Sequence, residues 1–537
     1  MQEKNSGMDP EMLSMVMETI SKLEKDRLDV ETKMEMDRRG EFPMELIRFM
    51  LGPDVALHLI FIPEEYGGLG AGARDIAVVS ERMAHMDLAV ATSFLAICLG
   101  MDPLRVGATE EQRQKYITRI AEEGLIVAYG VTEPEAGSNV QALKTKAEPV
   151  TDDSGRVAGY RLNGQKQFIT NGGVAELYTI LADAPGGPSF FVVEGGAPGL
   201  TPGKHEDKHG IRASNTSALI LEDLFVPVEN LIGGVEGQGL KQANEVFGYT
   251  RLMVATFGLG GGVAALEKAV SYSKERVQFG TTLAEKQGYT HRLLVPNAVR
   301  LEAARAYIEE TARRLDLGEE DLQVEGSIAK FFATEAGDAA ANDAIQALGG
   351  YGYIREYEVE KIKRDIKITT IFEGTSEIQR NIISMFRLRE SVRSKGGFYG
   401  EKASLLASLP EESGGPALAE AVKALNETLM AARKEKLTRL QHVMFLLGDM
   451  MTYCEVGEAM CIKAAGTESG RRDYIQAAAR LFAEEAAEMV FEKGLKIALG
   501  CGKELEGAAA SLGSLGLERR IGGYLRDMDM VADELVR

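Results

Sequence analysis

A single carboxylate, Glu373, lies in the segment IFEGTS between two apolar residues and a glycine. The side chains of Ile371 and Phe372 could shield it from water, and burial of a carboxyl group disfavours its charged form. We therefore expect the pKa of Glu373 to lie above the ordinary value of about 4.3, in the range that suits a general base. The same spacing also fits a helix that begins at Thr375 with Glu373 as a solvated flanking residue, and spacing alone favours this second interpretation.

Two segments in the middle of the chain combine hydroxyl groups with small or aromatic residues: YGVTEPEAGSNV at 129–140 and QKQFITNGG at 165–173. The first offers the hydroxyl groups of Thr132 and Ser138 beside small residues that let a ligand approach the backbone. In the second, Phe168 and Thr170 are two residues apart, so in a strand both would point to the same face. A ring beside a hydroxyl group could support a flavin. For either segment alone, an ordinary strand face is the simpler interpretation.

Composition limits the class of protein before any motif does. The 537 residues are 45% apolar and 26% charged, which is typical of a globular protein of about three or four domains. A net charge of -20 argues against a nucleic-acid partner. The four cysteines form no ligand pattern, which favours a reducing compartment. Since no apolar run looks long enough to span a bilayer, we expect a cytoplasmic protein or a mature organellar one.

The chain alternates between helical and strand-like composition. Apolar residues recur at helical spacing before residue 125 and again after residue 239, whereas the stretch between is rich in Val, Ile, Thr and Gly. Near the end, alternate steps of four and three residues place Cys454 and Cys461 on one packed helix face. We therefore expect an α+β, mostly helical fold with an N-terminal helical domain (1–124), a middle antiparallel β domain (125–235), a C-terminal helical bundle (236–390), a linker (391–416) and an extra helical domain (417–537).

Three other segments imitate ligand sites. FIPEEYGGLGAG, from Phe61 to Gly72, lacks the strand and helix of a phosphate loop and predicts a turn between helices. GLGGGV, from Gly258 to Val263, has helical sequence on both sides, so its glycines predict close helix packing. His205 and His209 could bind a metal on a helix, but the glycine that follows makes a helix there unexpected, and we predict no metal site.

Several segments in this order resemble the acyl-CoA dehydrogenase family. The run from Gln346 to Arg380 resembles the family's second signature, and TEPEAGS and QFIT resemble its flavin-binding motifs. The resemblance covers residues 40–390 and implies FAD-dependent dehydrogenation of an acyl-CoA thioester to the trans-2-enoyl-CoA. It implies that Glu373 removes the α-proton while the β-hydrogen leaves as hydride to flavin N5. The backbone N–H of Glu373 and a flavin ribityl hydroxyl would stabilise the thioester carbonyl.

The resemblance also implies contacts with the ligands. Thr132 would lie near the flavin pyrimidine edge, Ser138 near the pyrophosphate, and Thr170 would bond flavin N5. The implied cofactor contacts are Tyr129, Thr132, Ser138, Phe168, Thr170, Arg276, Gln278, Phe279, Gln287, Gln346, Gly349, Gly350, Thr375 and Glu377. The implied substrate contacts are Ser138, Tyr249, Arg251, Phe372 and Gly374. Because the family supplies the arginine matched by Arg276 to the FAD of a neighbouring subunit, we expect a homodimer, or a tetramer.

The chain departs from some relatives at informative positions. Where some members carry the base on the helix before Arg251, this chain has Tyr249 and Thr250, so Glu373 is the only well-matched base. Asn139 stands where many members have Asp, a change that affects only capping and is tolerable. Phe168 stands where many have Trp, and this second change could alter the packing and potential of the flavin.

The residues that would contact the end of the acyl group can also be compared with those of relatives. Glutaryl-CoA relatives present Arg and Ser to the distal carboxylate of their substrate, and the aligned residues here are Val90 and Ala91. An apolar acyl tail is therefore favoured over a dicarboxylate.

The C-terminal extension resembles that of very-long-chain acyl-CoA dehydrogenases, which are dimers. It could contact a membrane peripherally, although its acidic residues disfavour an anionic lipid surface. The family implies a role in fatty acid β-oxidation with an electron-transfer flavoprotein as acceptor. The alternatives are an acyl-CoA oxidase, which would use oxygen, and a catalytically idle assembly or scaffold protein. Glu373 together with Thr132, Ser138 and Thr170 weighs against the scaffold.

Overall fold

The computed structural model describes residues 7–319, 321–468, 470–502, 505–516 and 521–537. The chain forms two compact units. One comprises Met1–Met253 with Leu315–Glu319, and the other comprises Val254–Arg314 with Glu320–Arg537. The helical and β regions of the first unit and the helical bundle of the second confirm the predicted mostly helical α+β fold.

The first unit opens with helices whose starts are encoded in the sequence. They are α1 (Pro10–Arg27), α2 (Val30–Arg39), α3 (Met44–Leu51), α4 (Ala73–Met86), α5 (Leu88–Gly107) and α6 (Glu110–Glu123). Asp9 and Asp29 cap α1 and α2 through their side chains, and Thr109 and Gln112 form a capping box at α6. The FIPEEYGGLGAG segment forms short 3-10 helices and a turn before α4, as predicted.

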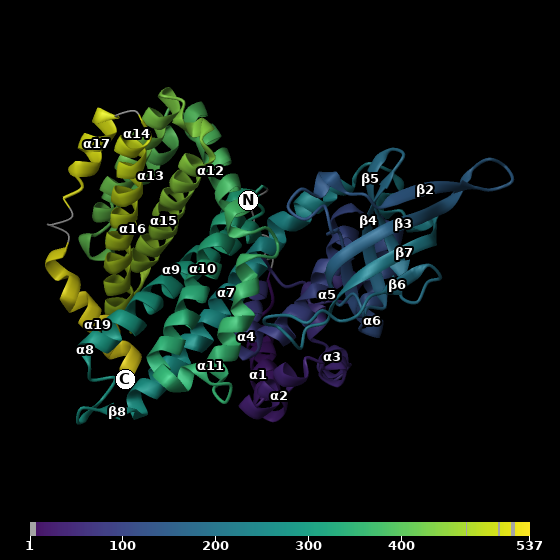
Figure 1. Cartoon of the computed structure of the whole chain (residues 1–537), viewed down its shortest axis with the longest axis horizontal. Helices are drawn as coiled ribbons and strands as arrows, with labels where there is room; N and C mark the ends of the chain where they lie inside the picture. The colour runs from purple at the N-terminus through teal and green to yellow at the C-terminus, as the bar shows by residue number, and fades with distance from the viewer. Residues whose placement is uncertain (1–6, 320, 469, 503–504, 517–520) are drawn as a thin grey trace. The chain divides into compact units, whose positions relative to one another are not determined.

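A seven-stranded sheet follows, in the order β1-β4-β2-β3-β7-β6 with β5 beside β4 (Figure 1). Its strands are β1 (Val127–Gly130), β2 (Lys146–Thr151), β3 (Val157–Thr170), β4 (Leu177–Ala184), β5 (Gly187–Glu194), β6 (Leu200–Pro202) and β7 (Thr216–Pro227). Most pairs are antiparallel, as expected, but β4 pairs in parallel with β1 and, at one position, with β2. Helix α5 is fastened to this sheet because the Thr179 hydroxyl donates to the Gly100 carbonyl at 2.8 Å.

The end of β3 departs from simple alternation. The register against β7 shifts between Lys166 and Ile169, and Phe168 has a positive φ of 57°. Lys166 and Ile169 are both buried although they are three residues apart, and Phe168 is 65% exposed. A β-bulge therefore inserts one extra residue between Lys166 and Ile169, so the regular strand that the prediction for Phe168 and Thr170 assumed is interrupted at Phe168.

The second unit is built on α7 (Gly239–Glu275), whose second half lies in it, with α9 (Val295–Asp316), α10 (Gln323–Leu348), α11 (Glu358–Ile366) and α12 (Ser376–Arg393). A β-carbon at Gly258 would lie 2.6 Å from the Cα of Thr334 on α10. This close approach confirms that the GLGGGV glycines serve helix packing. The hairpin of β8 (Val277–Gln278) and β9 (Thr281–Thr282) interrupts what we expected to be continuous helix.

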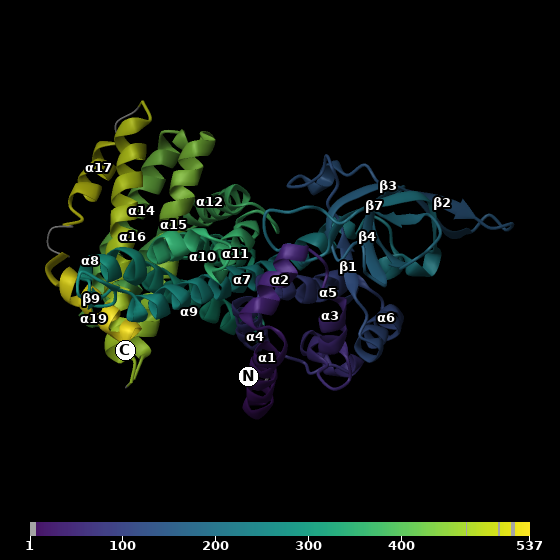
Figure 2. The same cartoon turned by 60° about the horizontal axis from the view of Figure 1, so that its bottom comes forward.

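The C-terminal extension is a set of helices packed on this bundle (Figure 2). These are α13 (Gly397–Ala407), α14 (Gly415–Lys434), α15 (Gln441–Gly466), α16 (Arg472–Gly500), α17 (Glu506–Gly513) and α19 (Tyr524–Val536). Cys454 and Cys461 are buried on α15, as predicted. The segment predicted to be a linker, 391–416, instead contains α13, whose Tyr399 is fully buried and donates to Glu455 at 3.0 Å.

Among the described residues, two helices are long and apolar enough to cross a membrane, α5 and α7. This corrects the expectation that no apolar run reaches that length. In both helices most of the apolar window, 83% and 78%, is buried inside the protein, as in a core helix.

Candidate active site

Glu373 lies on a tight turn between α11 and α12. Glu373 and Gly374 have positive φ values of 53° and 90°, and Thr375 caps α12 by accepting from the Ile378 N–H at 3.4 Å. A non-glycine residue in the left-handed region costs about 1–2 kcal/mol, so surrounding contacts must enforce it. The predicted helix start at Thr375 is thus correct, and Glu373 is held in a strained conformation directly before it.

Two buried side chains enforce that conformation. Lys330 on α10 donates through Nζ to the Gly374 carbonyl at 2.8 Å. Gln379 on α12 donates through Nε2 to the carbonyls of Glu373 and Gly374 at 3.0 and 2.9 Å. The φ of 90° at position 374 favours glycine, and a β-carbon there would also lie 2.6 Å from this Nε2.

Sequence reasoning missed Lys330 and Gln379. Both are fully buried, and a lone lysine in the apolar helical run SIAKFFA was the available signal, because a buried ammonium group needs acceptors.

The surroundings of Glu373 are less apolar than expected. Phe372 packs on Phe257 with ring centroids 6.5 Å apart, but Ile371 is 49% exposed. Ile371 is therefore too exposed to shield the carboxylate as expected, whereas Phe372 packs into the bundle beside it. Glu373 is half-buried, so its exposure lies between that of a shielded base and that of a solvated residue before a helix.

Glu377, predicted to contact the cofactor, lies in the first turn of α12. Its side chain is largely exposed and 3.7 Å from Arg380. Its own backbone N–H and the Thr375 side chain hold the pKa of Glu377 below its usual value. It therefore places a negative charge at the helix N-terminus, where such a charge is stabilised.

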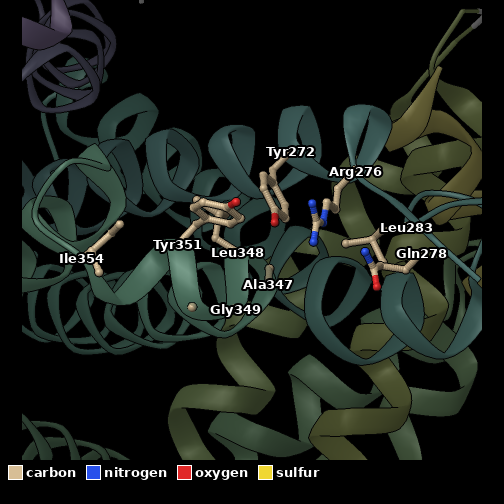
Figure 3. Close-up of a pocket in the computed structure, with 10 residues that line it drawn as sticks. Tyr272, Arg276, Gln278, Leu283, Ala347, Leu348, Gly349, Tyr351 and Ile354 are labelled. Carbon is tan, nitrogen blue, oxygen red and sulfur yellow. The ribbon is translucent and has the colours of Figure 1, made fainter.

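A second cluster of predicted residues meets in a pocket of about 370 Å³. Figure 3 shows Tyr272 and Arg276 extending from α7 toward Ala347, Leu348 and Gly349 at the end of α10. The lining is Tyr272, Arg276, Gln278, Leu283, Ala347, Leu348, Gly349, Gly350, Tyr351 and Ile354. Four of these, Arg276, Gln278, Gly349 and Gly350, are predicted cofactor contacts, and they come from segments about seventy residues apart in the chain.

The chemistry of this pocket fits an anionic group. Arg276 brings a guanidinium group, which binds phosphate oxygens well. A β-carbon at Gly349 or Gly350 would have no atom within 4 Å, so the backbone there is open to a ligand. Gln346 lies one turn earlier, exposed at the end of α10.

Two predicted cofactor residues that follow Gln278 in the chain, Phe279 and Gln287, do not line this pocket. Phe279 is 96% exposed at the tip of the β8–β9 hairpin. Gln287 donates through Nε2 to Asp529 on α19 at 2.9 Å, and the ring of His291 contacts the same carboxylate at 3.1 Å. The last helix of the extension thus contacts a segment that the sequence assigned to the cofactor.

The β region contributes its own predicted residues. Tyr129 stacks on Phe190, with centroids 5.7 Å apart. The Thr132 carbonyl accepts from the Gln167 N–H at 2.9 Å, which joins the two predicted flavin-binding segments. Ser138 is exposed on the loop that follows, where hydroxyl and amide groups are accessible to a ligand.

Of the predicted substrate contacts, Arg251 is buried on α7. The side chain of Tyr249 lies outside the part of the chain that the structure describes. The segment that contains His205 and His209, considered above as a metal site, is not helical. The ring nitrogens of His205 contact Lys208 and Asn215. Within the described ranges, no group of three His, Cys, Asp or Glu side chains is placed to hold a metal ion.

Family models match three consecutive parts of the chain. They are the acyl-CoA dehydrogenase N-terminal domain over residues 10–124, the middle domain over 128–224 and the C-terminal domain over 237–388. The fold and this site define a flavin-dependent oxidoreductase, and the chain belongs to the acyl-CoA dehydrogenase family. Membership confirms the predicted enzyme class and FAD as its cofactor.

Individual relatives cover different shares of the chain. It is 40% identical to a Bacillus subtilis acyl-CoA dehydrogenase over 363 residues, 66% of this chain and 92% of the relative. The structure of an acyl-CoA dehydrogenase from Bacillus anthracis, solved in complex with FAD, superposes with a TM-score of 0.85 at 24% sequence identity. The match covers 99% of this chain and 96% of the Bacillus anthracis chain. A structure described for the electron transferring flavoprotein of Acidaminococcus fermentans is 35% identical and covers 71% of this chain and 99% of its own chain, with a TM-score of 0.66. The Bacillus anthracis fold therefore includes a counterpart of the extension.

Proposed function

We propose that this protein oxidises an acyl-CoA thioester to the trans-2-enoyl-CoA, with Glu373 as the base that removes the α-proton. The observation that supports this role is the turn at Glu373 and Gly374, which Lys330 and Gln379 hold in a strained conformation. Strain of this kind is concentrated at functional sites, where a reacting group must be held in one place. Bound FAD would supply the oxidising chemistry by accepting the β-hydrogen with its electron pair.

We infer that FAD is shared between two subunits of a homodimer. Thr132, Ser138 and Thr170 would hold it from one subunit, and Arg276 with the backbone at Gly349 would reach its pyrophosphate from the other. The exposed apolar residues around the Arg276 pocket support this arrangement, because a contiguous apolar surface normally marks an interface. These residues are Val277, Phe279, Tyr351, Tyr353 and Ile354.

We propose an apolar acyl tail and an electron-transfer flavoprotein as the acceptor. Val90 and Ala91, aligned with the carboxylate-binding positions of glutaryl-CoA relatives, are fully buried on α5 and offer no charge to a dicarboxylate. The similarity to the solved structure described for the electron transferring flavoprotein of Acidaminococcus fermentans supports this choice of acceptor.

The direct test is an anaerobic titration of the purified holoprotein with a panel of acyl-CoAs that differ in chain length and polarity. An active dehydrogenase bleaches the absorbance of its bound flavin with at least one apolar acyl-CoA. Admitting air then separates the two enzyme classes, since a dehydrogenase reoxidises slowly and an oxidase rapidly. Bound flavin that no member of the panel bleaches would contradict the proposal.

A further inference from the structure

A buried ion pair lies at the base of the loop that carries Ser138. Lys166 Nζ is 2.7 Å from Glu133 Oε1 and 3.3 Å from the carbonyl oxygen of Val131. The Lys166 and Glu133 side chains are only 0% and 2% exposed. Burial lowers the pKa of Lys166 to about 8 against the opposing charge of Glu133, so the amine is still protonated at neutral pH.

The same carboxylate closes the loop at its far end. Glu133 accepts hydrogen bonds from the backbone N–H groups of Lys144 and Thr145, at 2.5 and 3.1 Å. These bonds and the charge of Lys166 outweigh burial and hold the pKa of Glu133 below its usual value. The Glu133 carboxylate therefore holds both ends of the loop formed by residues 134–143, which contains Ser138.

Lys166 also connects this loop to the bulged end of β3. The register shift begins directly after Lys166, and the next residue, Gln167, donates its N–H to the Thr132 carbonyl at 2.9 Å. Lys166 therefore extends from the same irregular segment that presents Phe168 and Thr170.

Stability alone does not account for the pair. Replacing a buried ion pair by apolar residues of similar volume is often neutral or stabilising. What the pair supplies is a fixed geometry between two segments that are also joined by the backbone hydrogen bond from Gln167 to Thr132.

We propose that Glu133 and Lys166 are positioning residues that fix the Ser138 loop against the end of β3 and thereby preorganise Thr132, Ser138 and Thr170 for FAD. Both side chains are almost fully buried, so we assign them no direct part in the reaction. The inference rests on the proposed use of these three hydroxyl groups as flavin contacts.

The test compares the FAD dissociation constant of the full-length protein with backbone amide exchange in residues 134–143. We expect Lys166→Met, which leaves Glu133 buried without its cation, to raise the dissociation constant about 10- to 100-fold and to accelerate exchange in the loop. The double variant Glu133→Gln with Lys166→Met keeps an acceptor for the loop amides without a buried charge, and we expect an intermediate dissociation constant.

The matched control is Lys33→Met, which removes another buried lysine of the same unit from its 2.9 Å ion pair with Glu24. It should leave FAD binding and loop exchange unchanged. Wild-type affinity and exchange in Lys166→Met, or an equal change in Lys33→Met, would overturn the inference. If Lys166→Met does not fold, wild-type affinity in the double variant overturns it. Failure of the wild-type protein to bind FAD would instead refute the proposed function.

Discussion

The ammonium group of Lys330 donates a 2.8 Å hydrogen bond to the carbonyl oxygen of Gly374 from a fully buried position on α10. Gln379 donates to the same carbonyl from α12 at 2.9 Å. Two helices of the bundle therefore hold the backbone immediately after Glu373. The position of the proposed base is set by residues that do not themselves transfer a proton.

Replacing Lys330 by Met should lower kcat by about 100-fold, because small misplacements of a reacting group have effects of this size. The affinity for FAD should change less than kcat, since most implied cofactor contacts, those of the Arg276 pocket among them, lie away from this turn. Steady-state turnover and flavin content of the purified variant measure the two effects. The control is Lys367→Met, a half-exposed lysine in the same region. Unchanged kcat in Lys330→Met, or an equal loss in the control, would contradict this role.

Replacing Arg276 by Met should weaken FAD binding about 10- to 100-fold, the worth of a hydrogen bond between charged groups. The loss should shrink at high salt if the partner is a pyrophosphate. Equilibrium titration of the apoprotein with FAD at two ionic strengths measures it. Arg292→Met, whose side chain is 74% exposed, is the matched control and should bind FAD normally. Normal binding by the Arg276 variant would remove this pocket from the cofactor site.

The extension is joined to α12 by a buried charge cluster. Arg387 lies 2.8 Å from Glu455 on α15 and 2.9 Å from Glu325 on α10. Because Arg387→Met leaves Glu455 buried without this cation and leaves Glu325 with Arg314 alone, we expect the free energy of unfolding to fall by about 3–5 kcal/mol. Denaturant unfolding measures this value, and Arg393→Met, an exposed arginine on the same helix, should change it little. A loss below about 1 kcal/mol, the upper value for a surface ion pair, would show that the cluster is not stabilising.

The same cluster predicts a pH dependence. Burial alone would raise the pKa of Glu325, but the charges and hydrogen bonds of Arg387 and Arg314 outweigh it and lower that pKa from 4.5. A carboxyl group whose pKa is lower in the folded state contributes stability above pH 4.5, and the contribution is lost as the pH falls through the folded-state value. Glu325→Gln should therefore flatten the acid side of the stability profile. An unchanged slope below pH 4.5 would contradict the assigned cause.

Features with a local signal could be predicted from the sequence. The period of apolar residues placed Cys454 and Cys461 on a buried face of α15, and helical sequence around GLGGGV identified its glycines as packing positions. The motif around Glu373 also located the turn and the start of α12 correctly. In each case the deciding residues lie within a few turns of one another.

Features that depend on distant partners could not be predicted. Phe168 follows a strand pattern, but the register against β7 creates a bulge that reverses the expected alternation. Tyr399 lies in a Gly-rich segment that resembles a linker, yet it is buried against Glu455, 56 residues later. Lys330 binds a carbonyl 44 residues away. A single sequence gives no direct information about such pairings.

Glu373→Gln tests the central claim most directly, because it removes the proton acceptor while keeping the size of the side chain. The variant holoprotein is mixed anaerobically with an acyl-CoA that bleaches the wild-type flavin, and the rate of bleaching is followed by stopped-flow spectroscopy. We predict full FAD content and a bleaching rate at least about 100-fold slower, the lower range for loss of a general base. Full FAD content with bleaching at the wild-type rate would contradict the assignment of Glu373 as the base.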